Sequence, residues 1–251
     1  MFLNKTVSKH NDMSSKYVYL LVDFLTFIFP FMFSFFPKAD FSKQWKHLWL
    51  AILIPGTIFI VWDEVFTRQG VWGFNENYLS GIYIGTLPLE EIFFFICITY
   101  ACVFTYESLT QLIKRDFFSG IEKSISVAIV TIAVLVALFN YQKAYTFWTL
   151  IVLGLSILVL RFHFKKELGR FYFAFVLLLF PFLVVNGILT GSWIDQPVVW
   201  YNDEENLGIR IGTIPIEDLF YAMLLMLMNV SIFEMLKARR NKAVHYSAMS
   251  N

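Results

Sequence analysis

The chain has little of what disulfides and metal sites require. Its 251 residues include two cysteines and four histidines. Both cysteines, Cys97 and Cys102, stand in one apolar run without partners for a disulfide or a metal site, so we interpret them as packing residues. The histidines stand in tails or between apolar runs, which argues against a buried histidine-based metal site. They are His10, His47, His163 and His245.

Motifs for bound cofactors are also missing. No Gly-x-Gly-x-x-Gly turn and no Walker loop is present, so neither a flavin, a nicotinamide nor a nucleotide triphosphate site is indicated. No pair of aspartate-rich motifs could hold a diphosphate through magnesium, which argues against a prenyltransferase. The formal net charge of +1 gives no basis for a nucleic-acid partner. We therefore expect no cofactor, no metal and no nucleic acid.

Charge is scarce and apolar residues are abundant. Charged residues make up 16% of the chain and hydrophobic residues 58%, with a mean hydropathy of +0.62. These values predict an integral membrane protein. A helix needs roughly 20 apolar residues to cross a bilayer, and seven runs approach this length. They are residues 17–36, 48–66, 86–107, 121–139, 144–161, 171–189 and 213–236. The predicted fold is all-α, with about seven transmembrane helices.

Basic residues indicate how these helices cross the membrane. Lys and Arg concentrate in one set of alternate connections, around Lys43, Lys114, Arg170 and Lys237, and such residues are retained on the cytoplasmic side. We therefore expect a multi-pass protein of the cell membrane with its N-terminus outside and its C-terminus in the cytoplasm. We assign four tryptophans to the aromatic belt at the membrane surface. They are Trp62, Trp72, Trp193 and Trp200.

An internal repeat divides the chain. The segment "GIYIGTLPLEEIFFF", which begins at Gly81, returns as "GIRIGTIPIEDLFYA", which begins at Gly208, a shift of 127 residues. Three apolar runs separate the two copies, so both cross in the same direction and form a parallel repeat. The predicted organisation is a polar tail at 1–16, a first three-span repeat at 17–116, a connector span at 117–143, a second three-span repeat at 144–237 and a basic tail at 238–251.

The match continues outside this segment. The same shift carries Glu107 onto Glu234, and Trp72 has a loose counterpart in Trp200. Further back, "DEVFT" at 63–67 resembles "NGILT" at 186–190, with Asn186 where the first copy has Asp63.

Each copy sets two adjacent carboxylates just inside an apolar run. These are Glu90 and Glu91 in the first copy, and Glu217 and Asp218 in the second. On the predicted topology they share the outer half of the membrane with Asp23, Asp63, Glu64 and Asn186. Polar residues at this depth are costly and usually face an interior cavity, so the pattern predicts a functional site. The alternative is that the acids only cap helices, since a proline and a carboxylate suit a first turn.

A resemblance to a known family follows from these motifs. The segment "VWDEVFTRQGVWGFNENYLSGIY" followed by "LPLEEIFFF", and its repeat "IPIEDLF", resembles the membrane-integral lycopene cyclases. These occur as two small subunits or as fused chains, and both halves match here, so the chain resembles the fused version. The resemblance implies an isomerase, a lycopene β-cyclase of carotenoid biosynthesis. Its partners would be lycopene or a related linear carotenoid and the lipid bilayer, and self-association or contact with other carotenoid enzymes stays open.

The predicted acids suit such a reaction. The terminal alkene of lycopene must be protonated, the cation must close the ring, and a ring proton must be removed, all without net redox change. Like charges and desolvation keep one of two buried carboxyls protonated, so a pair can supply both acid and base. We expect Glu90 and Glu217 to be the principal proton donors or acceptors. The remaining candidates are Glu91, Asp218 and Asp63 for catalysis, and Asp23, Glu64 and Asn186 for support or substrate binding.

Two other classes of protein stay open from the sequence. Carboxylates at membrane depth within a parallel repeat also describe a proton-coupled multi-pass transporter. A structural or assembly subunit would use the carboxylates as helix caps alone. The sequence also leaves open which carboxylate is the acid and which the base.

Overall fold

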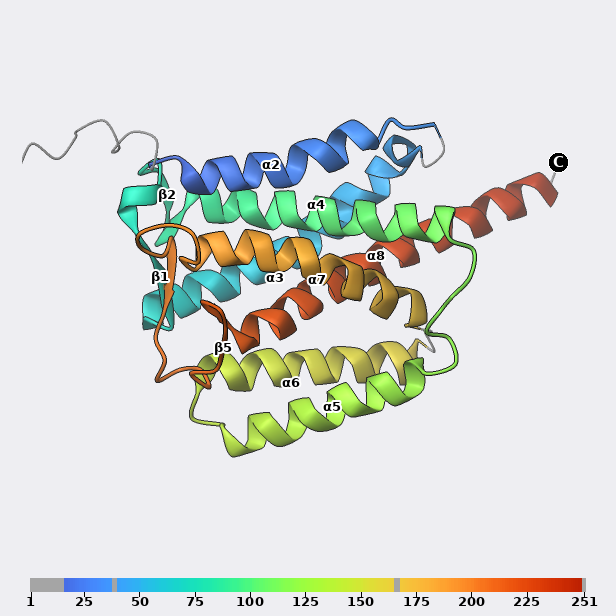
Figure 1. Cartoon of the computed structure of the whole chain (residues 1–251). Coiled ribbons are helices and arrows are strands. Elements are labelled where there is room, and N and C mark those ends of the chain that lie inside the picture. Colours follow the sequence, from blue (N-terminus) through green and yellow to red (C-terminus); the bar gives the residue numbers. More distant parts are fainter. Residues whose placement is uncertain (1–15, 38–39, 165–167, 250–251) are drawn as a thin grey trace, which may run out of the picture.

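A computed structural model describes residues 16–37, 40–164 and 168–249, and these form seven α-helices with short strands at one end of the bundle (Figure 1). The helices are α2 (Val18–Phe33), α3 (Trp45–Gln69), α4 (Leu89–Leu112), α5 (Glu122–Phe139), α6 (Ala144–Leu158), α7 (Gly169–Leu189) and α8 (Ile216–Met249). The strands are β1 (Trp72–Phe74), β2 (Tyr83–Ile84), β3 (Leu87–Pro88), β4 (Val199–Tyr201), β5 (Arg210–Ile211) and β6 (Ile214–Pro215). Short helical turns are η1 (Phe41–Gln44), η2 (Glu76–Tyr78) and η3 (Val159–His163).

The helices have the length and composition of membrane spans. Six of those in the described residues, α3 to α8, are long and apolar enough to cross a bilayer, whereas α2 is shorter, with 16 residues. Large apolar side chains such as Leu53 and Phe180 are exposed on the bundle surface, as expected where lipid surrounds a protein. The predicted all-α multi-pass membrane fold is confirmed. One detail was wrong, because His47 is buried within α3 and does not lie in a connection.

The two repeats interlock. Within each repeat the first helix packs against the third, α2 against α4 and α6 against α8. The middle helix of each repeat also packs against the third helix of the other repeat, α3 against α8 and α7 against α4. The two third helices, α4 and α8, contact each other. Helix α5 packs against α6 at one side of the bundle (Figure 1). This arrangement confirms two parallel three-helix repeats joined by a connector helix.

Strands β1 and β4 mark where the repeats meet. They pair antiparallel, with Gly73 opposite Trp200, and these two residues are 127 positions apart. Each strand therefore pairs with its own counterpart, as a local twofold axis requires. The expected match of Trp72 with Trp200 is corrected: Trp72 corresponds to Val199. Gly73 is the first repeat's counterpart of Trp200. The Trp200 indole lies over Gly73, and a Cβ added to Gly73 would come within 2.4 Å of that ring, so a second tryptophan would not fit there.

Two equivalent hairpins start the third helix of each repeat. The β2–β3 and β5–β6 hairpins turn through Gly85 and Gly212, whose φ angles of 69° and 63° are typical of glycine in two-residue hairpin loops. The second strands end at Pro88 and Pro215, and the helices begin at the next residue. The acidic pairs are thereby fixed in the first turns of α4 and α8.

Candidate active site

A cavity of about 400 Å³ begins at the end of the bundle that carries the strands and extends between the helices. Most of its wall is apolar and comes from α2, α4, α7 and α8. Along α4 the lining residues extend from Glu91 to Thr105, which is about 21 Å at the helical rise of roughly 1.5 Å per residue. The carboxylates of Glu91, Asp218 and Asp63 reach this cavity. It is therefore an elongated apolar space with acids gathered at one end.

Each repeat contributes one carboxylate hydrogen-bonded to a tyrosine. The Tyr19 hydroxyl of α2 donates to Glu91 at 2.5 Å, and the Tyr145 hydroxyl of α6 donates to Asp218 at 2.5 Å. Both tyrosines lie in the first turns of equivalent helices, and both are buried. Neither tyrosine was predicted from the sequence. The signal was weak because the two tyrosines are 126 residues apart, one short of the repeat shift.

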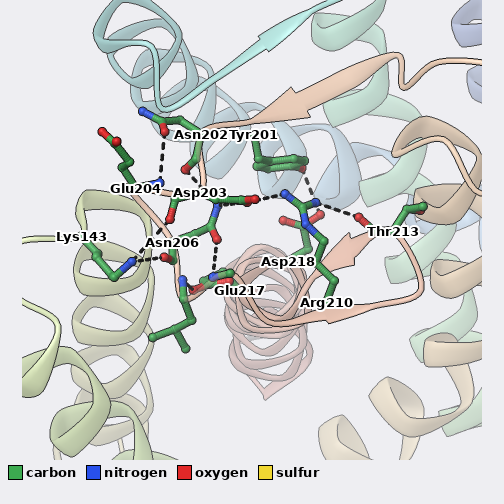
Figure 2. Close-up of polar contacts among 12 residues, drawn as sticks. Lys143, Tyr201, Asn202, Asp203, Glu204, Asn206, Arg210, Thr213, Glu217 and Asp218 are labelled. Carbon is green, nitrogen blue, oxygen red and sulfur yellow. Dashed lines mark hydrogen bonds and ion pairs between the residues drawn. The ribbon is translucent and has the colours of Figure 1, made fainter.

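Asp218 has three hydrogen-bond donors. Besides Tyr145, it accepts from the Asn186 side-chain amide at 2.6 Å. It also accepts from the Tyr201 hydroxyl at 3.0 Å (Figure 2). The side chain is buried, so these bonds replace water around the carboxylate. Asn186 thus acts through Asp218 and also lines the cavity itself.

The carboxyls of the first repeat have few hydrogen-bond donors, in contrast to Asp218. Asp63 and Asp23 are both 3% exposed. Within the described residues, neither oxygen of Asp23 nor Oδ2 of Asp63 has a hydrogen-bond partner. Both carboxyls lie close enough to Glu91 to interact electrostatically with it. Asp63 lines the cavity, whereas Asp23 stands behind the wall. Three carboxyls therefore share one buried region that has few donors.

Glu90 and Glu217, which the sequence ranked first, do not line the cavity. They make the same contact in the two repeats, accepting the backbone N–H of Ser80 at 2.6 Å and of Leu207 at 2.7 Å. Glu217 also accepts from the Thr146 hydroxyl at 2.6 Å. Adjacent helical residues point about 100° apart, so when Glu91 and Asp218 face the cavity their neighbours face the loops.

Glu64 also lies away from the cavity. It accepts from the backbone N–H of Thr86 at 2.9 Å and from the Thr86 hydroxyl at 2.8 Å, and it pairs with Arg68 at 2.6 Å. Glu64 thus fixes the β2–β3 turn. The structure brings together five of the eight predicted residues and places the other three, Glu64, Glu90 and Glu217, in the loop framework.

Aromatic side chains surround the acids. The Tyr221 ring lies 5.0 Å from Phe59 and 5.7 Å from Trp62, and the Tyr145 ring stacks on Tyr201 at 5.9 Å. The Tyr221 hydroxyl has no hydrogen-bond partner within the described residues, and it interacts electrostatically with all three cavity acids. Tyr221 was not among the residues predicted from the sequence. The aromatic faces can stabilise a cation through their ring quadrupoles.

Trp72 does not lie in the aromatic belt at the membrane surface, where the sequence predicted it. It lines the cavity and is 4% exposed, whereas Trp193 and Trp200 are 66% and 44% exposed. The assignment of Trp72 to the aromatic belt was therefore wrong, because strand pairing through β1 turns its ring into the bundle.

A polar network of loop residues lies beside Tyr201 and Asp218 (Figure 2). The Arg210 guanidinium bonds Asp203 at 2.5 Å and the Thr213 carbonyl at 2.9 Å, and it lies over the Tyr201 ring at 6.0 Å. The hydrogen bond from Arg210 holds the pKa of Asp203 below its usual value. Burial and the neighbouring Asp218 keep the pKa of Tyr201 well above its usual value, so its hydroxyl stays a donor at neutral pH. The network keeps Tyr201 placed over Asp218.

No group of three or more His, Cys, Asp or Glu side chains suited to a metal ion occurs in the part of the chain that the structure describes. Both cysteines are free thiols, and Cys102 lines the cavity.

The fold and this site define a multi-pass membrane protein with carboxylates at one end of an apolar internal cavity. Comparison with protein families gives its identity at the level of the family. The description "Lycopene cyclase" matches residues 16–109 and 142–236, and the chain belongs to that family. The two matched segments correspond to the two repeats and leave out all of α5.

Three fungal relatives carry the name bifunctional lycopene cyclase/phytoene synthase. The protein of Aspergillus oryzae is 26% identical over 115 residues, which are 43% of this chain and 20% of that protein. The Aspergillus niger protein is 29% identical over 86 residues, 34% of this chain and 14% of that protein. The Pyrenophora tritici-repentis protein is 35% identical over 77 residues, 31% of this chain and 12% of that protein. This chain thus matches a fifth or less of each relative's length. No solved structure matches it.

Proposed function

We propose that this chain is a lycopene β-cyclase, which closes the ends of lycopene or a related linear carotenoid into β-rings. The observation that carries the proposal is that two carboxylates, Glu91 and Asp218, reach one apolar cavity from the two repeats. Membership of the lycopene cyclase family supports the choice of substrate.

The reaction is an isomerisation whose protons balance. A carboxylic acid gives its proton to the terminal alkene, whose π electrons form the new C–H bond and leave a cation on the adjacent carbon. A nearby double bond of the chain attacks this carbon, closes the ring and carries the positive charge into it. A carboxylate then takes a ring proton, and the electrons of that C–H bond form the ring double bond. One proton is added and one is removed, so no redox cofactor is needed.

The cavity supplies what these steps require. Its apolar wall excludes water, which would otherwise trap the cation. Trp72, Tyr145 and Tyr221 present aromatic rings beside the acids. Such rings stabilise a cation by about 0.5–2 kcal/mol each. The elongated shape along α4 suits a linear polyene that enters end first while the rest stays in the bilayer.

Glu91 and Asp218 therefore take the catalytic roles that the sequence analysis gave first to Glu90 and Glu217. Asp63 shares the proton with Glu91, and Asn186 orients Asp218. Glu90, Glu217 and Glu64 position the helix starts and their loops. Asp23 supports the acidic region from behind the cavity wall.

The orientation of the chain in the membrane follows from its predicted topology. We assign the protein to the cell membrane with its acid-bearing end outside and its C-terminus in the cytoplasm, as the distribution of basic residues indicates. We keep the division into repeats at 17–116 and 144–237 with a connector at 117–143. At the opposite end of the bundle Glu107 is bonded to Lys237 at 2.7 Å and to Gln111 at 2.8 Å. A neutralised carboxylate there speaks against a proton path through both sides of the membrane.

Expression in cells that accumulate lycopene tests this function. Pigment chromatography is expected to show β-ring products when the wild-type chain is present and unchanged lycopene in the empty-vector control. Unchanged lycopene with the chain abundant in the membrane would overturn the proposal. Proton flux in liposomes that contain the purified chain would favour a transporter instead.

A further inference from the structure

The two halves of the site are equivalent in position but differ in chemistry. Each presents a carboxylate bonded to a tyrosine, Glu91 in the first repeat and Asp218 in the second. The neighbouring position on the middle helix of the repeat is Asp63 in the first and Asn186 in the second. One half is therefore rich in carboxyls, and the other is rich in hydrogen-bond donors.

The second half stabilises a charged carboxylate. Asp218 receives hydrogen bonds from the hydroxyls of Tyr145 and Tyr201 and from the amide of Asn186, at 2.5, 3.0 and 2.6 Å. Hydrogen bonds to the charged form of a carboxyl favour that form. The Asn186 amide carries no charge of its own and donates without competing for the proton. Asp218 is thus arranged to be an ionised proton acceptor.

The first half stabilises a bound proton. Asp23, Asp63 and Glu91 are each at most 7% exposed, and Asp23 and Asp63 each interact electrostatically with Glu91. Tyr19 is a donor to Glu91, but Asp63 Oδ2 and both oxygens of Asp23 lack partners among the described side chains and backbone. Interacting like charges cannot all be ionised in a buried, apolar site. A proton therefore resides within this group.

Resting on the proposed function, we infer that the repeats divide the reaction between them, with the Asp63 and Glu91 carboxyls protonating the alkene and Asp218 removing the ring proton. The proton leaves Glu91 for the CH carbon of the terminal alkene, which puts the cation on the neighbouring carbon that bears the two methyl groups, and a different proton passes from the ring to Asp218. To restore the starting state, the proton on Asp218 must return to Glu91. We assign this return to the Tyr221 hydroxyl, because Tyr221 lines the cavity, interacts electrostatically with Asp63, Glu91 and Asp218, and has a hydroxyl without a hydrogen-bond partner among the described residues.

Ring closure in heavy water separates the two roles. Membranes that contain the wild-type chain, with lycopene added, should form β-rings that each carry one deuterium delivered by the exchanged acid. Glu91→Gln should leave the lycopene unlabelled and linear, because no cation forms. Asp63→Asn should form labelled rings at least tenfold more slowly than the wild type, because an amide beside Glu91 favours the ionised form of Glu91.

Asp218→Asn should give a different product. The alkene is still protonated, so deuterium enters, but the cation then loses a proton from another carbon or is trapped by water. Mass spectrometry and chromatography should show labelled products whose ring double bond is misplaced or whose ring carries a hydroxyl group. Labelled, misplaced products from Glu91→Gln together with inert lycopene from Asp218→Asn would reverse the assignment. Wild-type rates in all three variants would also overturn it.

A second readout does not depend on activity. Infrared spectra of the purified wild-type chain should show the C=O stretching band of protonated carboxylic acids. This band should lose intensity in Glu91→Gln and in Asp63→Asn but persist in Asp218→Asn. Loss of the band in Asp218→Asn alone would contradict the division of roles even if that variant were inactive.

The matched control is Glu234→Gln. Glu234 lies on α8 and does not line the cavity. Among the described residues it forms an ion pair with Lys237, at 3.7 Å. This variant should match the wild type in label, product and infrared band. If the wild-type chain itself closes no ring, the proposed function fails together with this inference. If the wild type cyclises and the variants contradict the pattern above, the inference fails alone.

Discussion

Neighbouring acids of one helix have different surroundings in this chain, and these surroundings decide what each acid does. Glu90 is fully buried and accepts a backbone N–H from Ser80, whereas Glu91, one residue later, faces the cavity and a tyrosine hydroxyl. Glu217 and Asp218 repeat this division. The chemical type of a residue is therefore less informative than the direction in which the helix turns it.

Glu90→Gln and Glu91→Gln should have different effects. Glu90→Gln weakens a charge-assisted bond to the Ser80 N–H, so we expect the free energy of unfolding to fall by about 1–3 kcal/mol. Glu91→Gln should leave that free energy nearly unchanged and abolish ring formation. Thermal unfolding in detergent and pigment analysis measure the two effects. A Glu90→Gln variant with wild-type stability and no activity would return the leading role to Glu90.

Tyr145→Phe removes one of the three donors to Asp218. A hydrogen bond to a charged group contributes about 1.5–3 kcal/mol, so the rate of β-ring formation should fall by roughly tenfold or more. The control is Tyr141→Phe, since Tyr141 is 65% exposed and lies outside the cavity. Equal rates for Tyr145→Phe and the wild type would show that Asp218 does not depend on this bond.

At the scale of elements, the β1–β4 pair links the two repeats above the site. Gly73 lies opposite Trp200, and the indole occupies the space where any side chain on Gly73 would stand. The strands carry Trp72 and Tyr201, both of which line the cavity. The close contact thus sets the position of two aromatic walls.

Gly73→Ala should therefore destabilise the protein. The added methyl group would lie within 2.4 Å of the Trp200 ring, and overpacking of this kind costs about 1–3 kcal/mol. The double variant Gly73→Ala with Trp200→Ala should recover part of the lost stability, as measured by unfolding in detergent. Wild-type stability of Gly73→Ala alone would show that the strand pair is looser than the contact distance implies.

An ion pair joins helices α4 and α8 at the end of the bundle opposite the strands. Glu107 is 2% exposed and is bonded to Lys237 of α8 at 2.7 Å. Lys237→Met should lower the free energy of unfolding by about 3–5 kcal/mol, because it leaves a buried carboxylate without its cation. The double variant with Glu107→Gln should be more stable than Lys237→Met. If Lys237→Met unfolds like the wild type, this pair does not hold α4 to α8.

For the whole molecule, the sequence predicted the membrane class, the helices and the parallel repeat, because hydropathy and a constant residue shift record these features directly. It also predicted that Asp63, Glu91 and Asp218 share one end of the bundle. The direction of each acid was not predictable, because Glu90 and Glu91 differ only in their rotation about the helix. Tyr19, Tyr145 and Tyr221 were missed because one tyrosine among many aromatic residues has no distinctive pattern.

The central claim is that one carboxylate from each repeat acts on the same ring in one cavity. Initial rates of β-ring formation in lipid vesicles test it most directly, with the wild-type chain, Glu91→Gln and Asp218→Asn reconstituted at equal amounts. If the cavity is shared, neither single variant forms β-rings at a measurable rate. If each variant retains about half the wild-type rate, the repeats are two independent sites, and the claim of a shared site is contradicted.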